Sequence, residues 1–161
     1  MPEKIAIYPG TFDPITLGHL DILQRASKLF DRVIITLAIN SNKTPLFSKE
    51  ERMMFIRDAV KDMPNVSADS FEGMLITFAE KIGAIAVIRG LRAISDFEFE
   101  FQLALMNRKQ NQEITTVFLM PNEKYTYLNS SIIREVSKFG GDVSSFITPL
   151  VAEKLKEKFL T

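Results

Sequence analysis

Hydrophobic and polar residues follow two different periods along the chain, and these predict strands separated by amphipathic helices. Short runs rich in β-branched residues predict five strands, at residues 5–8, 33–39, 66–71, 84–88 and 115–120. The runs at 33–39 and 84–88 are almost continuously apolar, as expected for central strands that are covered on both faces. We therefore predict an α/β fold: a Rossmann-like, doubly wound, five-stranded parallel sheet with helices on both faces.

Capping signals and chain breakers place the helices between these strands. Three helix starts carry capping signals: Ser48 with Glu51, Ser95 with Glu98, and Thr148 before Pro149. Periodicity predicts further helices at 18–30, 74–82 and 130–139. No internal repeat or linker interrupts the pattern, so we expect a single domain over residues 1–161.

The segment 96–106 alternates strictly between polar and apolar residues, which by itself favours a strand. The Ser95 and Glu98 signal and the order of elements favour a helix instead, and we predict a helix. One helical face would then hold Phe97, Phe101, Ala104 and Leu105, and a second face would hold Phe99, Leu103 and Met106. One face can cover the sheet. The second predicts a contact with another subunit, since soluble monomers seldom expose a large apolar stripe.

Composition excludes several kinds of chemistry. The chain has no cysteine and one histidine, which excludes disulfides, thiolate nucleophiles, cysteine-held metals and multi-histidine metal sites. Lys and Arg number 20 and Asp and Glu number 20, so no net positive charge favours nucleic acid. No apolar run reaches the length of a membrane helix, and we see no export signal. We expect a cytoplasmic, soluble protein without nucleic-acid or membrane partners, with no metal held by its own side chains.

Charged residues follow the predicted strands at one edge of the sheet. His19 comes after the first strand, Lys43 after the second, and Arg89 and Arg92 after the fourth. Ligands bind outside the carboxyl ends of parallel strands, and two helices begin at the same edge. Cationic side chains together with helix N-termini predict an anion site.

Each of these residues also has a plain structural explanation. His19 could simply cap a helix, Lys43 lies in a polar loop, and surface arginines are usually solvated. The segment Asn129-Ser130-Ser131 matches a helix N-cap, although capping and phosphate binding use the same free N–H groups. The functional interpretation therefore depends on whether these side chains converge.

Neither the P-loop nor the G-x-G-x-x-G motif occurs, but T-L-G-H at residues 16–19 matches the T/H-x-G-H motif of the nucleotidylyltransferase superfamily. Four segments carry a closer resemblance: Y-P-G-T-F-D-P-I-T-L-G-H at 8–19, K-T-P-L-F-S-K-E-E-R at 43–52, I-R-G-L-R-A-I-S-D-F-E-F-E at 88–100 and N-S-S-I-I-R at 129–134. With these segments the chain resembles the bacterial phosphopantetheine adenylyltransferases over essentially its whole length. It departs from them at Asn129, where the family usually has serine.

This resemblance implies transfer of the adenylyl group of ATP to 4′-phosphopantetheine, which gives dephospho-coenzyme A and pyrophosphate in the penultimate step of coenzyme A synthesis. It implies direct in-line attack without a covalent intermediate, Mg²⁺ that arrives with ATP, a homohexamer, and coenzyme A as a possible feedback inhibitor. A phosphate monoester is already an anionic nucleophile, so positioning and charge stabilisation suffice for the chemistry.

The resemblance also assigns residues. The phosphopantetheine side would be held by Thr11, Lys43, Leu75 and Arg89. The ATP side would be held by Thr11, Phe12, His19, Gly90, Leu91, Arg92, Glu100, Tyr125, Thr126, Tyr127, Leu128, Asn129, Ser130 and Ser131. His19 would stabilise the transition state, with Lys43, Arg89 and Arg92 supplying positive charge.

Two other functions stay open at this point. Another member of the superfamily, such as a nicotinamide-nucleotide adenylyltransferase or a glycerol-phosphate cytidylyltransferase, shares the T-x-G-H motif, but the I-R-G-L-R-A segment argues against both. A non-catalytic nucleotide-binding module is the alternative of a different class. The presence of His19, Lys43 and Arg89 together argues against such a module.

Overall fold

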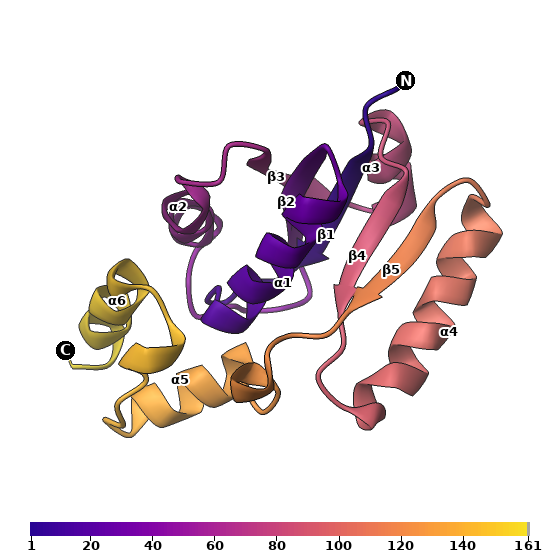
Figure 1. The fold of residues 1–161 in the computed structure, drawn as a ribbon. Coiled ribbons are helices and arrows are strands. Elements are labelled where there is room, and N and C mark those ends of the chain that lie inside the picture. The colour runs from indigo at the N-terminus through magenta and orange to yellow at the C-terminus, as the bar shows by residue number, and fades with distance from the viewer. Residues whose placement is uncertain (161) are drawn as a thin grey trace.

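Five parallel strands form one sheet in the order β3-β2-β1-β4-β5, in a computed structural model that describes residues 1–160 (Figure 1). The strands are β1 (Ile5–Gly10), β2 (Arg32–Ile39), β3 (Val66–Glu72), β4 (Ala86–Gly90) and β5 (Thr115–Leu119). The predicted parallel α/β sheet is confirmed. The two most apolar runs, β2 and β4, lie inside the sheet on either side of β1, and β3 and β5 form its edges.

Helices cover both faces of the sheet, as predicted. They are α1 (Leu17–Leu29), α2 (Lys49–Val60), α3 (Leu75–Lys81), α4 (Ile94–Gln110), α5 (Ser130–Lys138) and α6 (Pro149–Phe159), with short 3₁₀ turns at Glu123–Tyr125 and Ser144–Phe146. The core residues of α1, α2, α5 and α6 belong to one face, and α3 packs on the other, where α4 lies beside β5 (Figure 1).

The apolar runs of the strands are explained by two separate cores. Val33 and Ile35 of β2 point into the larger core, whereas Ile34 between them points into the smaller core under α3. All three side chains are buried. A strand that is covered on both faces needs apolar residues at every position, and this is why β2 shows no alternation.

Two of the three predicted helix starts are confirmed. Ser48 and Glu51 form a reciprocal capping box at α2, and the Thr148 hydroxyl caps α6. The predicted Ser95 and Glu98 box at α4 is wrong: this helix begins two residues earlier, after Ala93, without a side-chain cap. Asp96 instead accepts hydrogen bonds from the backbone and side chain of Arg92, both at 3.3 Å.

Residues 96–106 form a helix, which confirms the prediction against the alternating pattern. The predicted faces are present, but neither is buried. The face with Phe101 and Leu105 lies toward Phe118 of β5 and leaves a cavity of about 180 Å³. On the second face, Phe99 is 65% exposed and Met106 is 61% exposed. The sheet alone therefore does not cover this helix.

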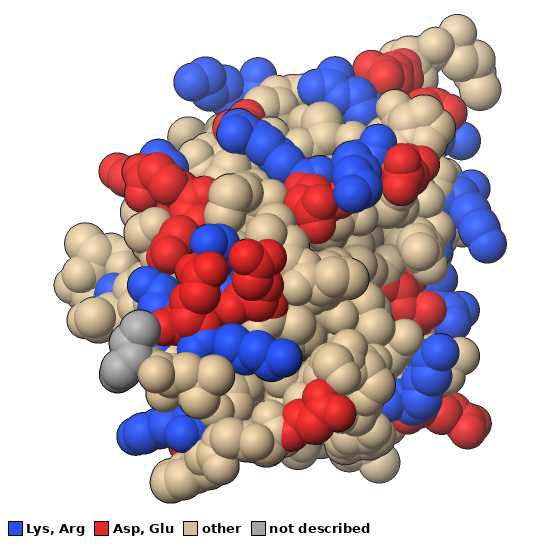
Figure 2. Space-filling model, turned by 90° about the vertical axis from the view of Figure 1, so that its left-hand side faces the viewer, with Lys and Arg blue, Asp and Glu red and all other residues tan. Residues whose placement is uncertain are grey.

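The outer face made by α2 and α6 carries acidic and basic side chains side by side (Figure 2). Lys158 of α6 lies 3.5 Å from Glu51 of α2, and Lys154 pairs with Glu157 within α6. Exposed pairs of this kind contribute little to stability, because water and salt screen their attraction. Among the described helices, none combines the length and apolar character needed to cross a membrane.

Candidate active site

A cavity of about 560 Å³ opens at the carboxyl ends of the central strands. Strand order reverses between β1 and β4, because β2 and β3 extend the sheet on one side of β1 and β5 extends it on the other (Figure 1). Such a reversal leaves a crevice that α/β proteins use for nucleotides. The cavity volume lies within the range of about 300–1,000 Å³ that is usual for small-molecule sites.

The structure brings most of the predicted site residues together in this cavity. They are Thr11, Phe12, His19, Lys43, Arg89, Gly90, Arg92, Glu100, Tyr125, Leu128, Asn129, Ser130 and Ser131. Loops and elements that are far apart in the sequence contribute to it, so the convergence that the sequence interpretation required is present.

Four predicted residues do not line the cavity. Leu75 packs against the smaller core under α3, and the ring of Tyr127 lies edge-on to Phe146 at 5.8 Å between centroids. The Thr126 hydroxyl donates to the carbonyl of Glu123, and the Leu91 N–H donates to the carbonyl of Leu119 next to the end of β4. In this conformation local packing, not the cavity, accounts for all four.

His19 both caps α1 and faces the cavity. The Thr16 N–H donates to Nδ1 of His19 at 3.0 Å, and the His19 N–H donates to the Thr16 hydroxyl at 3.3 Å. Because Nδ1 accepts, the neutral ring carries its proton on Nε2. The ring edge packs against Phe12 at 5.0 Å between centroids. The capping interpretation and the functional interpretation of His19 are therefore compatible. The capping contact to Nδ1 fixes the ring and leaves Nε2–H as a hydrogen-bond donor.

The charge state of His19 gives a direct prediction. Burial, together with the positive charge of Arg92, lowers the pKa of His19 from 6.5 to about 4, so the imidazole is neutral at pH 7. The unfolded chain binds this proton near 6.5, so the stability that His19 contributes is complete above that pH and is lost as the pH falls toward 4. His19 is the only histidine, so its ring NMR signal needs no assignment. We expect this signal to titrate near pH 4, and a midpoint of 6.5 would contradict the geometry.

Arg89 lies within β4 and not after it, which corrects the predicted end of this strand by two residues. Its guanidinium is held by Glu100 of α4 through two hydrogen bonds, of 2.8 Å from Nε and 2.6 Å from Nη2. Burial opposes the charge of Arg89, but the hydrogen bonds and the negative charge of Glu100 outweigh it and raise the pKa of Arg89. The bidentate ion pair with Glu100 fixes the orientation of the Arg89 guanidinium and offsets its positive charge.

Arg92 and Lys43 differ in how far neighbouring carboxylates offset their positive charge. Arg92 pairs with Asp96 at 3.3 Å and donates through Nη1 to the carbonyl of Leu128 at 3.2 Å. Lys43 is exposed in the loop after β2, and no carboxylate among residues 1–160 lies within ion-pair distance of it. Lys43 is therefore the cationic side chain at this cavity whose charge is least offset.

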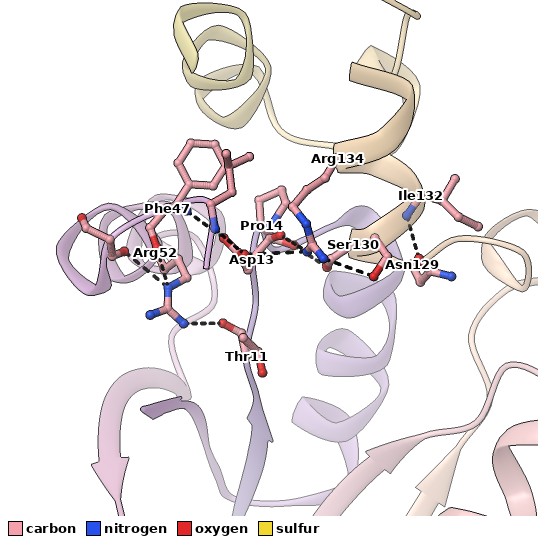
Figure 3. Close-up of polar contacts among 12 residues, drawn as sticks. Thr11, Asp13, Pro14, Phe47, Arg52, Asn129, Ser130, Ile132 and Arg134 are labelled. Carbon is pink, nitrogen blue, oxygen red and sulfur yellow. Dashed lines mark hydrogen bonds and ion pairs between the residues drawn. The ribbon is translucent and has the colours of Figure 1, made fainter. Parts of the chain in front are cut away.

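The start of α5 lines the cavity, and Figure 3 shows Ser130 and Arg134 of this helix beside Asp13 and Pro14. Asn129 caps the helix by accepting the Ile132 N–H at 2.8 Å, so the departure from the family pattern keeps the cap, as predicted. The Ser130 hydroxyl donates to the carbonyl of Pro14 at 2.8 Å, which ties α5 to the loop after β1. The first N–H groups of α5 remain available to an anion.

Sequence reasoning did not single out several lining residues. They are Tyr8, Pro9, Gly10, Asp13, Thr16, Ile22, Thr44, Pro45, Pro121 and Arg134. Half of them lie inside the segment 8–19, and the resemblance of that whole segment to the family was the signal that could have found them. Tyr8 is the most distinctive, because its burial raises the pKa of the phenol, although Arg89 and Arg92 oppose that effect. Tyr8 is therefore a neutral hydroxyl at the base of the cavity.

Comparison with known proteins agrees with this geometry. Residues 7–136 match the model of the cytidylyltransferase-like family. A phosphopantetheine adenylyltransferase of Caldanaerobacter subterraneus subsp. tengcongensis is 50% identical over 97% of this chain and 98% of its own length. That of Methylococcus capsulatus is 56% identical over 96% and 95%. A crystal structure assigned as a nicotinate-nucleotide adenylyltransferase from Vibrio parahaemolyticus superposes with a TM-score of 0.73 at 25% identity, covering 96% of this chain and 99% of that one.

An open parallel sheet with a cationic cavity at its switch point defines a nucleotide-binding α/β protein. The matches show that the chain belongs to the cytidylyltransferase-like family and, within it, to the phosphopantetheine adenylyltransferases.

Proposed function

We propose that this protein transfers the adenylyl group of ATP to 4′-phosphopantetheine and releases pyrophosphate, with dephospho-coenzyme A as the second product. The observation that carries the proposal is the meeting of His19, Lys43, Arg89 and Arg92 in one cavity at the strand-order reversal. Relatives about half identical over nearly the full chain bear the name of this activity. We also propose a cytoplasmic location for the enzyme.

In this reaction an oxygen of the phosphopantetheine phosphate attacks the α-phosphorus of ATP, and the bond from that phosphorus to the pyrophosphate oxygen breaks. No base is needed, because the attacking phosphate is an anion near neutral pH. Negative charge grows on the α-phosphate oxygens in the transition state, and Nε2–H of His19 is the donor suited to it. Lys43 and Arg89 would hold the acceptor phosphate, and Arg92 with the N-terminus of α5 would hold the phosphates of ATP.

We treat Mg²⁺ as part of the substrate, bound to the phosphates of ATP. Within residues 1–160, no three side chains of the metal-binding types gather at one place. Mg²⁺ commonly keeps several waters and binds substrate phosphates, so it does not require a protein cage. The residues Glu100 and Asp96 are engaged by arginines in this structure.

An acceptor panel tests the proposal. Pyrophosphate release should be measured with Mg²⁺-ATP and, in turn, 4′-phosphopantetheine, phosphopantothenate and nicotinate mononucleotide. We expect release with phosphopantetheine only. Release with the mononucleotide would assign the chain to another activity of the superfamily, and ATP binding without release would support a non-catalytic module.

We also propose that the protein assembles into a homohexamer through α4. None of the residues of α4 is buried, and its outer face presents Phe99 and Met106 to solvent. Apolar area of this kind is expected to be covered by another copy. Light scattering at micromolar concentration should report an oligomer, and Phe99→Glu should dissociate it more than Gln102→Glu, which adds the same charge on the same helix. A wild-type monomer would contradict this assembly.

Coenzyme A is a proposed feedback inhibitor. It contains both the pantetheine arm and the adenylyl group of the product, so it can fill the same cavity, but its 4′-phosphate is already esterified in the diphosphate bridge and cannot attack ATP. We expect added coenzyme A to raise the apparent KM for phosphopantetheine, and rates that are unchanged at millimolar coenzyme A would contradict inhibition.

A further inference from the structure

The turn that follows β1 has a backbone conformation that needs support. Phe12 has φ of +46°, in the left-handed region that residues other than glycine seldom adopt. Its ring is buried over Gly10, where a Cβ atom would come within 2.9 Å of the ring. Strained residues persist only where surrounding contacts determine them, and they concentrate at functional sites. The contacts on both sides of Phe12 are therefore expected to serve the function of the site as well as its stability.

Arg52 of α2 supports the turn from the Thr11 side (Figure 3). Its side chain is 5% exposed, and no carboxylate of the described chain pairs with it. It donates from Nη1 to the carbonyl of Thr11 at 3.0 Å and from Nε to the carbonyl of Phe47 at 3.1 Å. A buried guanidinium without a counter-charge is costly, so stability alone is a poor reason to keep one here.

Asp13 supports the turn from the other side (Figure 3). Its buried carboxylate accepts the N–H groups of Leu46 and Phe47, at 2.8 and 3.0 Å. These two residues end the loop that carries Lys43. Arg134 of α5 donates to the carbonyl of Asp13 at 2.6 Å, and its guanidinium lies 3.7 Å from the carboxylate. Asp13 thus joins the turn after β1, the loop after β2 and helix α5.

We propose that Arg52 and Asp13 are positioning residues for the acceptor side of the reaction. Neither is assigned a contact with substrate. Arg52 fixes the peptide of Thr11, Asp13 fixes the end of the Lys43 loop, and Phe47 is shared by both. Together they set the separation between Thr11 and Lys43, the two groups that would meet the acceptor phosphate from different loops. This inference rests on the proposed function, because it needs an acceptor that binds between those loops.

Steady-state kinetics with three variants tests the role. Arg52→Met removes both hydrogen bonds, Arg52→Lys keeps the charge but cannot reach the carbonyls of Thr11 and Phe47 together, and Asp13→Asn removes the second N–H acceptor. Arg57→Met, at an exposed arginine on the same helix, is the matched control. Small displacements of reacting groups cost up to about 10²-fold in rate. We expect kcat/KM for phosphopantetheine to fall by about 10- to 100-fold in Arg52→Met and Asp13→Asn and by less in Arg52→Lys.

ATP affinity separates a loss of positioning on the acceptor side from a general disturbance of the fold. The Kd for ATP, measured by calorimetry, should stay within about threefold of wild type in every variant that folds, since only Thr11 and Phe12 of the residues assigned to ATP lie in the supported turn and the others lie outside it. If Arg52→Met does not fold, Arg52→Lys and Asp13→Asn carry the test. Rates within twofold of wild type, or equal losses of ATP affinity and acceptor use, would overturn the positioning role. Wild-type protein that releases no pyrophosphate with phosphopantetheine would instead overturn the proposed function, and the acceptor role with it.

Discussion

Replacing His19 with alanine is expected to lower kcat by about 10²- to 10³-fold, the usual loss for one transition-state donor. The ring is neutral at pH 7, its Nδ1 is occupied by the Thr16 N–H, and the residue lines the cavity. The KM values should change little, because the donor acts where charge develops and not on the bound substrates. Steady-state rates of pyrophosphate release measure the effect.

Loss of half of the capping box at α1 is a second consequence of the same change, and it needs a control. The Thr16 hydroxyl still accepts the N–H of residue 19, so the loss of stability should be smaller than the roughly 1 kcal/mol that removal of a whole N-cap costs. Glutamine at this position can restore the capping contact without restoring the ring, so His19→Gln should melt close to wild type while kcat stays at least about tenfold low. Activity within a few-fold of wild type in His19→Ala would remove His19 from the mechanism.

Replacing Lys43 with alanine is expected to impair the use of phosphopantetheine by about 10²-fold in kcat/KM and to leave the Kd for ATP unchanged. The ammonium group is exposed, unpaired among residues 1–160, and located on the loop after β2, which is a different segment from those that carry the residues assigned to ATP. Its removal should therefore cost no stability.

Lys49→Ala is the matched control, since Lys49 is an exposed lysine at the start of α2. It should match wild type in both measurements. Calorimetry with ATP and initial rates with phosphopantetheine separate the two sides of the cavity. If Lys43→Ala weakens ATP binding as much as acceptor use, the lysine belongs to the nucleotide side.

The fold could be predicted because the central strands β1, β2 and β4 are buried on both faces, so each of them leaves an apolar run in the sequence. The limits of that signal appear at β4, where the prediction ended at Ile88. Arg89 and Gly90 continue the ladder by pairing with Phe118 and Leu119 of β5. A polar residue inside a strand carries no apolar signal, and its pairing depends on a partner strand far along the chain.

The helix starts also show that a signal decided by nearby residues can be predicted, whereas one that depends on other contacts in the fold is missed. The Ser48 cap is decided within four residues and was predicted. At α4 the Ser95 signal was equally local, but Asp96 accepts from Arg92 instead, and the helix begins before the predicted cap. In α1 the side chain that completes the box is His19, which is not one of the usual capping partners.

Topology predicted those site residues that directly follow a strand at the carboxyl edge of the sheet. His19, Lys43 and Arg92 were found in this way. The pairing of Arg89 with Glu100 was not, since it depends on how α4 packs beside the sheet. Arg52 and Asp13 were also missed as functional residues, because their partners are backbone groups of loops that meet only in the folded chain.

Isotope labelling tests adenylyl transfer to phosphopantetheine most directly. The protein should be incubated with Mg²⁺-ATP and 4′-phosphopantetheine whose phosphate carries ¹⁸O. The masses of both products should then be measured by mass spectrometry. Direct attack predicts dephospho-coenzyme A that retains every labelled oxygen, one of them in the new bridge, together with unlabelled pyrophosphate. The absence of an adenylylated product, or the appearance of label in pyrophosphate, would contradict the account.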